Sequence, residues 1–285
     1  MRGFGIQQLR KVGRRWLYGA IALIMATGII AITPKPSHAD INWFDLIFRG
    51  VQYIQLSSLS DDQEVQLGQQ TDQALKQQGV QIYDDNPDIV AYLDEIGQRL
   101  AATSQRSQIP YTFQIVDDDS INAFATSGGF VYIHKGLIEE ADTEAELAGV
   151  VAHEIGHVVG RHAINQMREI TLASGVAGAL GVDQNTLVNI GVELALFLPN
   201  SREAEYEADQ LGFDNMGAAG YDQEGSVTFM QKLADGGGSP PEFFSTHPHP
   251  ENRVDRLQTM YNESAQTDAT DGSSTQAYQS RISGL

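Results

Sequence analysis

One segment near the middle of the chain constrains the fold more than any other. Thr143 and Glu146 form a capping box, and the apolar run 147–159 that follows predicts a helix. That helix contains the sequence HEIGH, from His153 to His157. Two histidines at this spacing share one helical face, at the separation required by a single ion about 2.0–2.1 Å from each nitrogen. The spacing also suits two ordinary hydrogen-bonded histidines, so a metal site needs a third ligand.

A second predicted helix supplies that ligand. The chain breaks at Pro199, and Asn200 or Ser201 can cap the helix that begins there. Glu205 and Asp209 lie one turn apart on this helix and share a face. A catalytic zinc site needs three protein ligands and one open position, and each ligating histidine needs an outer partner for its other N–H. We therefore expect Glu205 to be the third ligand and Asp209 to orient a histidine.

The absence of cysteine narrows the chemistry further. None of the 285 residues is a cysteine, which excludes a thiol nucleophile, a disulfide framework and a Cys-ligated metal. Any metal must therefore be held by nitrogen and oxygen. The chain has 37 acidic and 18 basic residues, a net charge of −19, and such a field repels phosphate backbones. We expect no nucleic-acid partner.

The first 39 residues differ from the rest in charge. They hold six of the 18 basic residues and no acidic one, which leaves −25 for residues 40–285. A basic stretch, the apolar run 17–33 and a short polar segment ending at Ala39 match the three regions of a secretory signal. The alternatives are an uncleaved N-terminal anchor and, from a pair of arginines, a twin-arginine signal. In each case we expect export, to the periplasm or an equivalent extracytoplasmic compartment.

The remaining sequence predicts one α+β domain, mainly α, over residues 40–261. Apolar periodicity predicts helices over 61–78 and 88–102. Two strands are expected, over 111–116 and 130–134, the second opened and closed by glycines. The expected architecture is therefore a helical domain with a small sheet.

Four segments have specific expectations. Strand 130–134 is expected to offer a free edge to an extended substrate, or merely to complete the sheet. Segment 40–60 is amphipathic and is expected to cap the domain or to contact a membrane. The apolar stretch 170–198 is expected to be a lid over the cleft or a second peripheral membrane contact. The candidate hinges in it are Gly175, Gly178 and Gly181. The polar stretch 262–285 is expected to be a disordered tail.

Taken in this order, the motifs resemble those of the gluzincin zinc metallopeptidases, the family that contains the CAAX prenyl endopeptidase, HtpX and the periplasmic protease BepA. The resemblance extends over roughly residues 59–261. Its motifs are the HExxH helix, Ser201-Arg202-x-x-Glu205-x-x-Ala208-Asp209-x-x-Gly212, Asn122-Ala123-Phe124-Ala125 with Gly128-Gly129, Gly220-Tyr221-Asp222, and Thr246-His247-Pro248 with Arg253. The layout is similar to a BepA-like catalytic domain without a repeat domain, which implies a zincin-like fold with a small sheet beside the HExxH helix.

The resemblance also implies a role for each matching residue. His153, His157 and Glu205 would bind one Zn²⁺ per chain. Glu154 would be the general base, and Asp209 would support the ligands from outside.

Two further residues would complete the catalytic machinery. His247, held in a constrained loop, would face the metal and either stabilise the oxyanion or occupy the open coordination position. Arg253 would anchor that loop or the transition-state charge. Four other polar residues near the motifs are given ordinary structural roles: Glu203, Glu207, His162 and His249. His134 is assigned no role.

The expected function is that of a zinc endopeptidase. It would hydrolyse peptide bonds of unfolded or misassembled exported or membrane-associated proteins by Glu154-assisted attack of zinc-bound water. One alternative is a zinc-bearing, chaperone-like binding module with slow or repressed proteolysis. Another is a metal-free helical domain with a chance motif. Polypeptides are the expected partners, and the sequence carries no signal for an oligomeric state.

Overall fold

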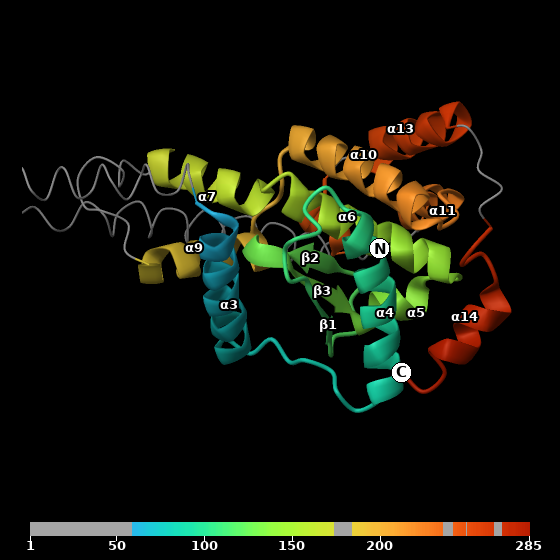
Figure 1. Ribbon diagram of the computed structural model, residues 1–285, viewed down its shortest axis with the longest axis horizontal. Coiled ribbons are helices and arrows are strands. Elements are labelled where there is room, and N and C mark those ends of the chain that lie inside the picture. Colours follow the sequence, from blue (N-terminus) through green and yellow to red (C-terminus); the bar gives the residue numbers. More distant parts are fainter. Residues whose placement is uncertain (1–58, 174–183, 236–241, 249, 265–269) are drawn as a thin grey trace, which may run out of the picture. The chain divides into compact units, whose positions relative to one another are not determined.

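Helices make up most of the fold (Figure 1). The computed structural model describes residues 59–173, 184–235, 242–248, 250–264 and 270–285. The elements in these ranges are α3 (Asp61–Gln77), α4 (Pro87–Thr103), β1 (Thr112–Val116), β2 (Ala123–Ala125), a 3-10 turn (Ser127–Gly129), β3 (Phe130–His134), α5 (Lys135–Glu140), α6 (Glu144–Val159), α7 (His162–Ala173), α9 (Gln184–Phe197), α10 (Arg202–Ala219), α11 (Glu224–Asp235), α12 (Phe243–Thr246), α13 (Pro250–Glu263) and α14 (Thr275–Arg281). The expected α+β, mainly helical class is confirmed.

The three strands form one mixed sheet in the order β1-β3-β2. β1 pairs with β3 in parallel, with Ile115 opposite Ile133, and β2 pairs with β3 antiparallel, with Phe124 opposite Tyr132. The expectation of a free edge at 130–134 is therefore wrong, because β3 is hydrogen-bonded on both sides. All five of its residues are buried, as suits a continuous apolar strand at the centre of a sheet. The outer strand beside it is β2, which is too short to give a sequence signal.

Helix α6 is almost completely buried and packs against α10, α11 and α4. The crossing with α10 depends on two glycines. A Cβ at Gly156 would lie 2.6 Å from the carbonyl oxygen of Ala208, and a Cβ at Gly212 would lie 2.8 Å from the backbone nitrogen of His153. Side chains there would push the helices apart. The close approach brings the carboxylates of α10 to the histidines of α6.

The ends of these two helices follow the sequence closely. The hydroxyl of Thr143 accepts a hydrogen bond from the Glu146 N–H, as expected of a cap. The Glu146 carboxylate accepts from the Asp142 N–H, one residue earlier than a capping box requires. Ser201 caps α10, and Gly220 ends it in the left-handed conformation with φ 79°.

The C-terminal segment contains an ordered helix, α14. Tyr278 is 1% exposed, and its hydroxyl donates to the carbonyl oxygen of Ile138 over 2.6 Å. Ile282 is also buried. The prediction of a disordered tail over 262–285 is therefore wrong for residues 270–285, because two apolar side chains are enough to dock a short helix on the domain.

The stretch 170–198 is described at both ends, by α7 and α9, which pack against each other. α9 also packs against α3 and approaches α12. Its three candidate hinge glycines, the expected signal over 1–39 and all but the end of segment 40–60 lie outside the described residues. None of the described helices has the length and hydropathy needed to cross a membrane.

Candidate metal centre

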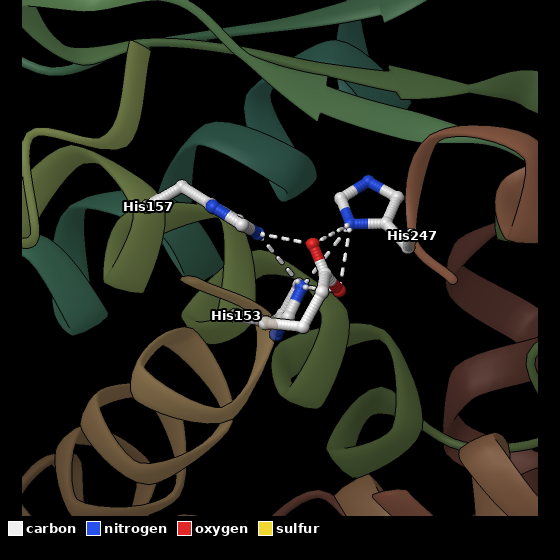
Figure 2. Close-up of side chains that lie close together, drawn as sticks. His153, His157 and His247 are labelled. Atoms are coloured by element: carbon white, nitrogen blue, oxygen red, sulfur yellow. Dashed lines mark hydrogen bonds and ion pairs between the residues drawn. The ribbon is translucent and has the colours of Figure 1, made fainter. Parts of the chain in front are cut away.

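Four side chains converge at one buried point, from three parts of the fold. His153 and His157 lie one turn apart on α6, Glu205 lies in the first turn of α10, and His247 directly follows α12. The ring nitrogens of the three histidines point toward one another (Figure 2). All four side chains are at most 6% exposed, so water screens them little. The close crossing of α6 and α10 is what assembles the group.

The donor atoms of these four side chains all lie within 4.8 Å of one another. Nε2 of His153 lies 3.1 Å from Nε2 of His157 and 3.3 Å from Nδ1 of His247. The Glu205 oxygens lie 3.5, 3.4 and 3.2 Å from the same three nitrogens in turn. Ligands about 2.0–2.1 Å from a tetrahedral zinc ion are themselves about 3.3–3.4 Å apart. The residues present therefore fit zinc in both donor type and spacing.

Burial and neighbouring charges prepare two of these groups to act as ligands. Burial lowers the pKa of His157 to about 3, which leaves its ring neutral. Burial alone would protonate Glu205, but the positive fields of His247 and Arg253 hold the pKa of its carboxyl well below the ordinary value. A neutral imidazole and an ionised carboxylate are the forms that bind a metal.

A carboxylate and a guanidinium support His153 from behind. Nδ1 of His153 lies 3.0 Å from Oδ1 of Asp209, the place expected for that residue. Arg253, from α13, donates to both oxygens of Asp209 over 2.6 and 2.8 Å, and it lies 2.6 Å from Oε2 of Glu205. Burial disfavours a charged Asp209, yet Arg253 outweighs burial and lowers the pKa of this carboxyl to about 2. These contacts make Arg253 a support for two carboxylates; its transition-state role stays a prediction.

Glu154 lies beside the donor cluster, and its carboxylate is free to accept hydrogen bonds. It is fully buried, and neither carboxylate oxygen has a hydrogen-bond partner among the described residues. Its Oε1 lies 3.5 Å from Nε2 of His247, and burial raises the pKa of its carboxyl. A cavity of about 40 Å³ adjoins it, bounded also by His157 and by Leu194 and Ala195 of α9. This volume holds about three water molecules and no peptide.

His247 is fixed by two contacts that aim one ring nitrogen at the cluster. Its ring stacks on Phe243, with centroids 4.4 Å apart and planes 17° apart. Its Nε2 lies 3.2 Å from the carbonyl oxygen of Ala123 in β2, which can only accept, so Nε2 carries the proton. Nδ1 is then the nitrogen that faces the cluster, 3.2 Å from Glu205 and 3.3 Å from Nε2 of His153. Of the two expected roles, this arrangement favours occupation of the open position.

Comparison with known proteins identifies the family of this chain. The model of peptidase family M48 matches residues 88–261, which is more than half of the chain. The chain belongs to peptidase family M48. The resemblance to these metallopeptidases is confirmed, and the described domain is a metallopeptidase domain.

Several relatives of the M48 domain carry protease names. The chain is 34% identical to a beta-barrel assembly-enhancing protease of Yersinia pestis over 227 residues, 73% of this chain and 46% of the relative. It is 34% identical to the mitochondrial metalloendopeptidase OMA1 of Arabidopsis thaliana over 155 residues, 54% of this chain and 32% of the relative. It is 26% identical to the metalloprotease YcaL of Escherichia coli over 254 residues, 84% and 95% of the two chains. The chain spans about half the length of the first relative.

The structure of this M48 domain adds two residues that the sequence analysis did not assign to the site. His162, the first residue of α7, places Nδ1 2.8 Å from Nδ1 of His157, a contact that the helical spacing does not predict. Glu207 lies 3.3 Å from the other nitrogen of His162. His134 lies apart from the cluster, bonded to Ser120. His249 is outside the described residues.

Proposed function

We propose that this M48 protein is an exported zinc endopeptidase that cleaves unfolded or misassembled polypeptides. The observation that carries the proposal is the arrangement of four buried N and O donors, all within 4.8 Å of one another, beside a buried glutamate with unpaired oxygens. Three donors suit a catalytic zinc ion, and the fourth stands where water or substrate would bind. A metal-free helical domain would leave this group of neighbouring donors without a function.

The protein residues can then carry the proton through peptide hydrolysis. A bound zinc ion supplies a Lewis acid that activates water and polarises a peptide carbonyl. Glu154 accepts a proton from water at a carboxylate oxygen and passes it to the leaving amine. Its raised pKa suits this, because a carboxylate that titrates nearer to neutral pH can both accept and release the proton.

Substrate entry requires movement, because the cavity of about 40 Å³ beside Glu154 is too small for a peptide. α9 forms part of its wall, which supports the lid interpretation of 170–198. The outer strand β2 lies next to the site, and an extended peptide could add to it through main-chain hydrogen bonds. Recognition of this kind selects locally extended chains, hence unfolded or misassembled polypeptides.

The setting outside the cytoplasm rests on the export signal expected over residues 1–39. The first relative is named for enhancing β-barrel assembly, and a role near an assembling membrane protein is our proposal for this chain by analogy. Peripheral contact with a membrane through 40–60 or 170–198 is a further proposal, based on the apolar content of both segments.

Cleavage of unfolded casein by the purified full chain tests the proposal. We expect cleavage that o-phenanthroline abolishes, and a loss of about 10²- to 10⁴-fold in Glu154→Gln with zinc retained, because only the general base is removed. Wild-type cleavage in the absence of zinc, or normal cleavage by Glu154→Gln, would contradict it.

A chaperone-like binding module is the second candidate function, and the position of His247 favours it. Nδ1 of His247 lies 3.3 Å from Nε2 of His153 and 3.2 Å from Oε1 of Glu205, so the ring competes with water and substrate for a place at the metal. If His247 holds proteolysis in check, His247→Ala should cleave casein faster than the wild type. In a chaperone-like module, the Glu154→Gln variant should suppress the aggregation of unfolded casein as well as the wild type does.

A further inference from the structure

The second ligating histidine, His157, has an outer partner that belongs to none of the motifs. We propose that His162 is a positioning residue for the zinc site, which holds the ring of His157 in the orientation and tautomer that leave Nε2 free for the metal. This inference rests on the proposed zinc centre.

The contact between the two rings is short and buried. Their Nδ1 atoms lie 2.8 Å apart, the rings meet edge to face at 76°, and His162 is 7% exposed. Two ring nitrogens at this distance share one proton, so one donates and the other accepts. The Nε2 atom of His157 faces His153 and Glu205 and must be unprotonated to bind a metal. The proton is therefore on Nδ1 of His157, which donates to His162.

The contact at the other ring nitrogen of His162, Nε2, favours the tautomer that accepts from His157. A neutral ring that accepts at Nδ1 carries its proton on Nε2. That atom lies 3.3 Å from Oε2 of Glu207, whose side chain is 60% exposed and borders a cavity of about 430 Å³. The carboxylate accepts this proton. The hydrogen bonds that link His157 to His162 and His162 to Glu207 can thus both form while both imidazoles are neutral.

A strained corner between α6 and α7 places His162 in this position. Arg161 has φ 54°, in the left-handed region that non-glycine residues rarely adopt. Its guanidinium donates to the carbonyl oxygen of Leu59 over 2.7 Å and lies 3.0 Å from the Glu64 carboxylate, which holds the corner in place.

Gly160, the residue before Arg161, also determines where the His162 ring can lie. A Cβ added to Gly160 would lie 2.4 Å from Nε2 of His162, so the imidazole can pack here only against a glycine. The backbone of Gly160 is helical, with φ −71°, and would itself accept an alanine. The sequence Gly160-Arg161-His162 therefore interrupts the helix between α6 and α7 and leaves room for the ring beside His157.

A matched set of variants in the full chain tests the role of His162. Asparagine and leucine have nearly the same shape, and only asparagine has an oxygen that can accept from Nδ1 of His157. His134→Leu is the control, because His134 is also 7% exposed and its Nδ1 also has a hydrogen-bond partner, the hydroxyl of Ser120. The readouts are the zinc dissociation constant, by competition with a chromogenic chelator, and the absorption spectrum of the Co²⁺-substituted protein.

We expect His162→Leu to weaken zinc binding about 10- to 100-fold, as loss of an outer partner of a ligand typically does. His162→Asn should recover most of this loss, and His134→Leu should bind zinc as the wild type does. The Co²⁺ spectrum should change in His162→Leu alone, because the orientation of one ligand changes.

Gly160→Ala gives a second test that keeps the imidazole and displaces it, and it should also weaken zinc binding. This variant decides the matter if His162→Leu fails to fold by circular dichroism. Equal zinc affinity in His162→Leu and His134→Leu, or in Gly160→Ala and the wild type, would overturn the role of His162 alone. Failure of the wild type to bind zinc would instead overturn the proposed function together with this role.

Discussion

The two ligating histidines of α6 are supported in different ways. Behind His153 stand a buried carboxylate, Asp209, and the fully buried guanidinium of Arg253. Behind His157 stands a second imidazole, His162, which leads to the largely exposed carboxylate of Glu207. One side of the centre is held by buried charges, and the other by neutral rings that reach toward solvent.

This difference separates stability from ligand orientation. Buried charges are costly to leave unpaired, so the His153 side should dominate the folding free energy and its dependence on pH. The neutral contact on the His157 side costs little to lose but fixes a tautomer. Substitutions on the two sides should therefore differ in size and in kind.

The largest effect is expected for Arg253→Met. Removal of the guanidinium leaves Glu205 and Asp209 as buried carboxylates without their cation. Breaking a buried ion pair in this way costs about 3–5 kcal/mol. Urea unfolding of the metal-free full chain should show a loss of stability of this size.

The matched control for Arg253→Met is Arg281→Met. Arg281 pairs with Glu95 over 2.6 Å, but both side chains are at least half exposed, so about 1 kcal/mol or less should be lost. Equal losses in the two variants would contradict the view that buried charge stabilises the His153 side.

A smaller effect is expected from acid. The pKa of Asp209 is lowered to about 2 in the fold, so the ionised carboxylate stabilises the folded state above its ordinary pKa. That contribution, on the order of 2 kcal/mol, should disappear as the pH falls from about 4 to about 2. The free energy of unfolding of the metal-free wild type and of Asp209→Asn should be measured across this pH range. It should fall more steeply with decreasing pH in the wild type. Parallel pH profiles would assign the acid sensitivity to other carboxylates.

The smallest effect is expected for Glu207→Gln. The glutamine can still accept from His162, and the side chain is 60% exposed, so stability should change by less than about 0.5 kcal/mol. Zinc affinity should stay close to that of the wild type. A loss comparable to that of Arg253→Met in a urea titration would show that the two sides are supported alike.

The sequence predicted the charged side well and the neutral side poorly. His153, His157, Glu205 and Asp209 are readable because each pair lies one turn apart on a helix, and helical spacing determines which residues share a face. His162 follows a left-handed Arg161, and no helical period extends across such a corner.

Other errors have similar physical causes. β3 was expected at an edge although its five residues are all buried, and the short β2 that covers its other side has no periodicity to detect. α14 lies in a polar stretch in which Tyr278 and Ile282 provide the burial. In each case tertiary packing determined what local composition did not.

The zinc content of the purified full chain tests the central claim most directly. Elemental analysis should find about one zinc ion per chain in the wild type and in Glu154→Gln, because three protein ligands hold a catalytic zinc ion and Glu154 is not among them. It should find almost none in His153→Ala, which lacks a ligand. A wild type without zinc, or zinc retained in full by His153→Ala, would contradict the account.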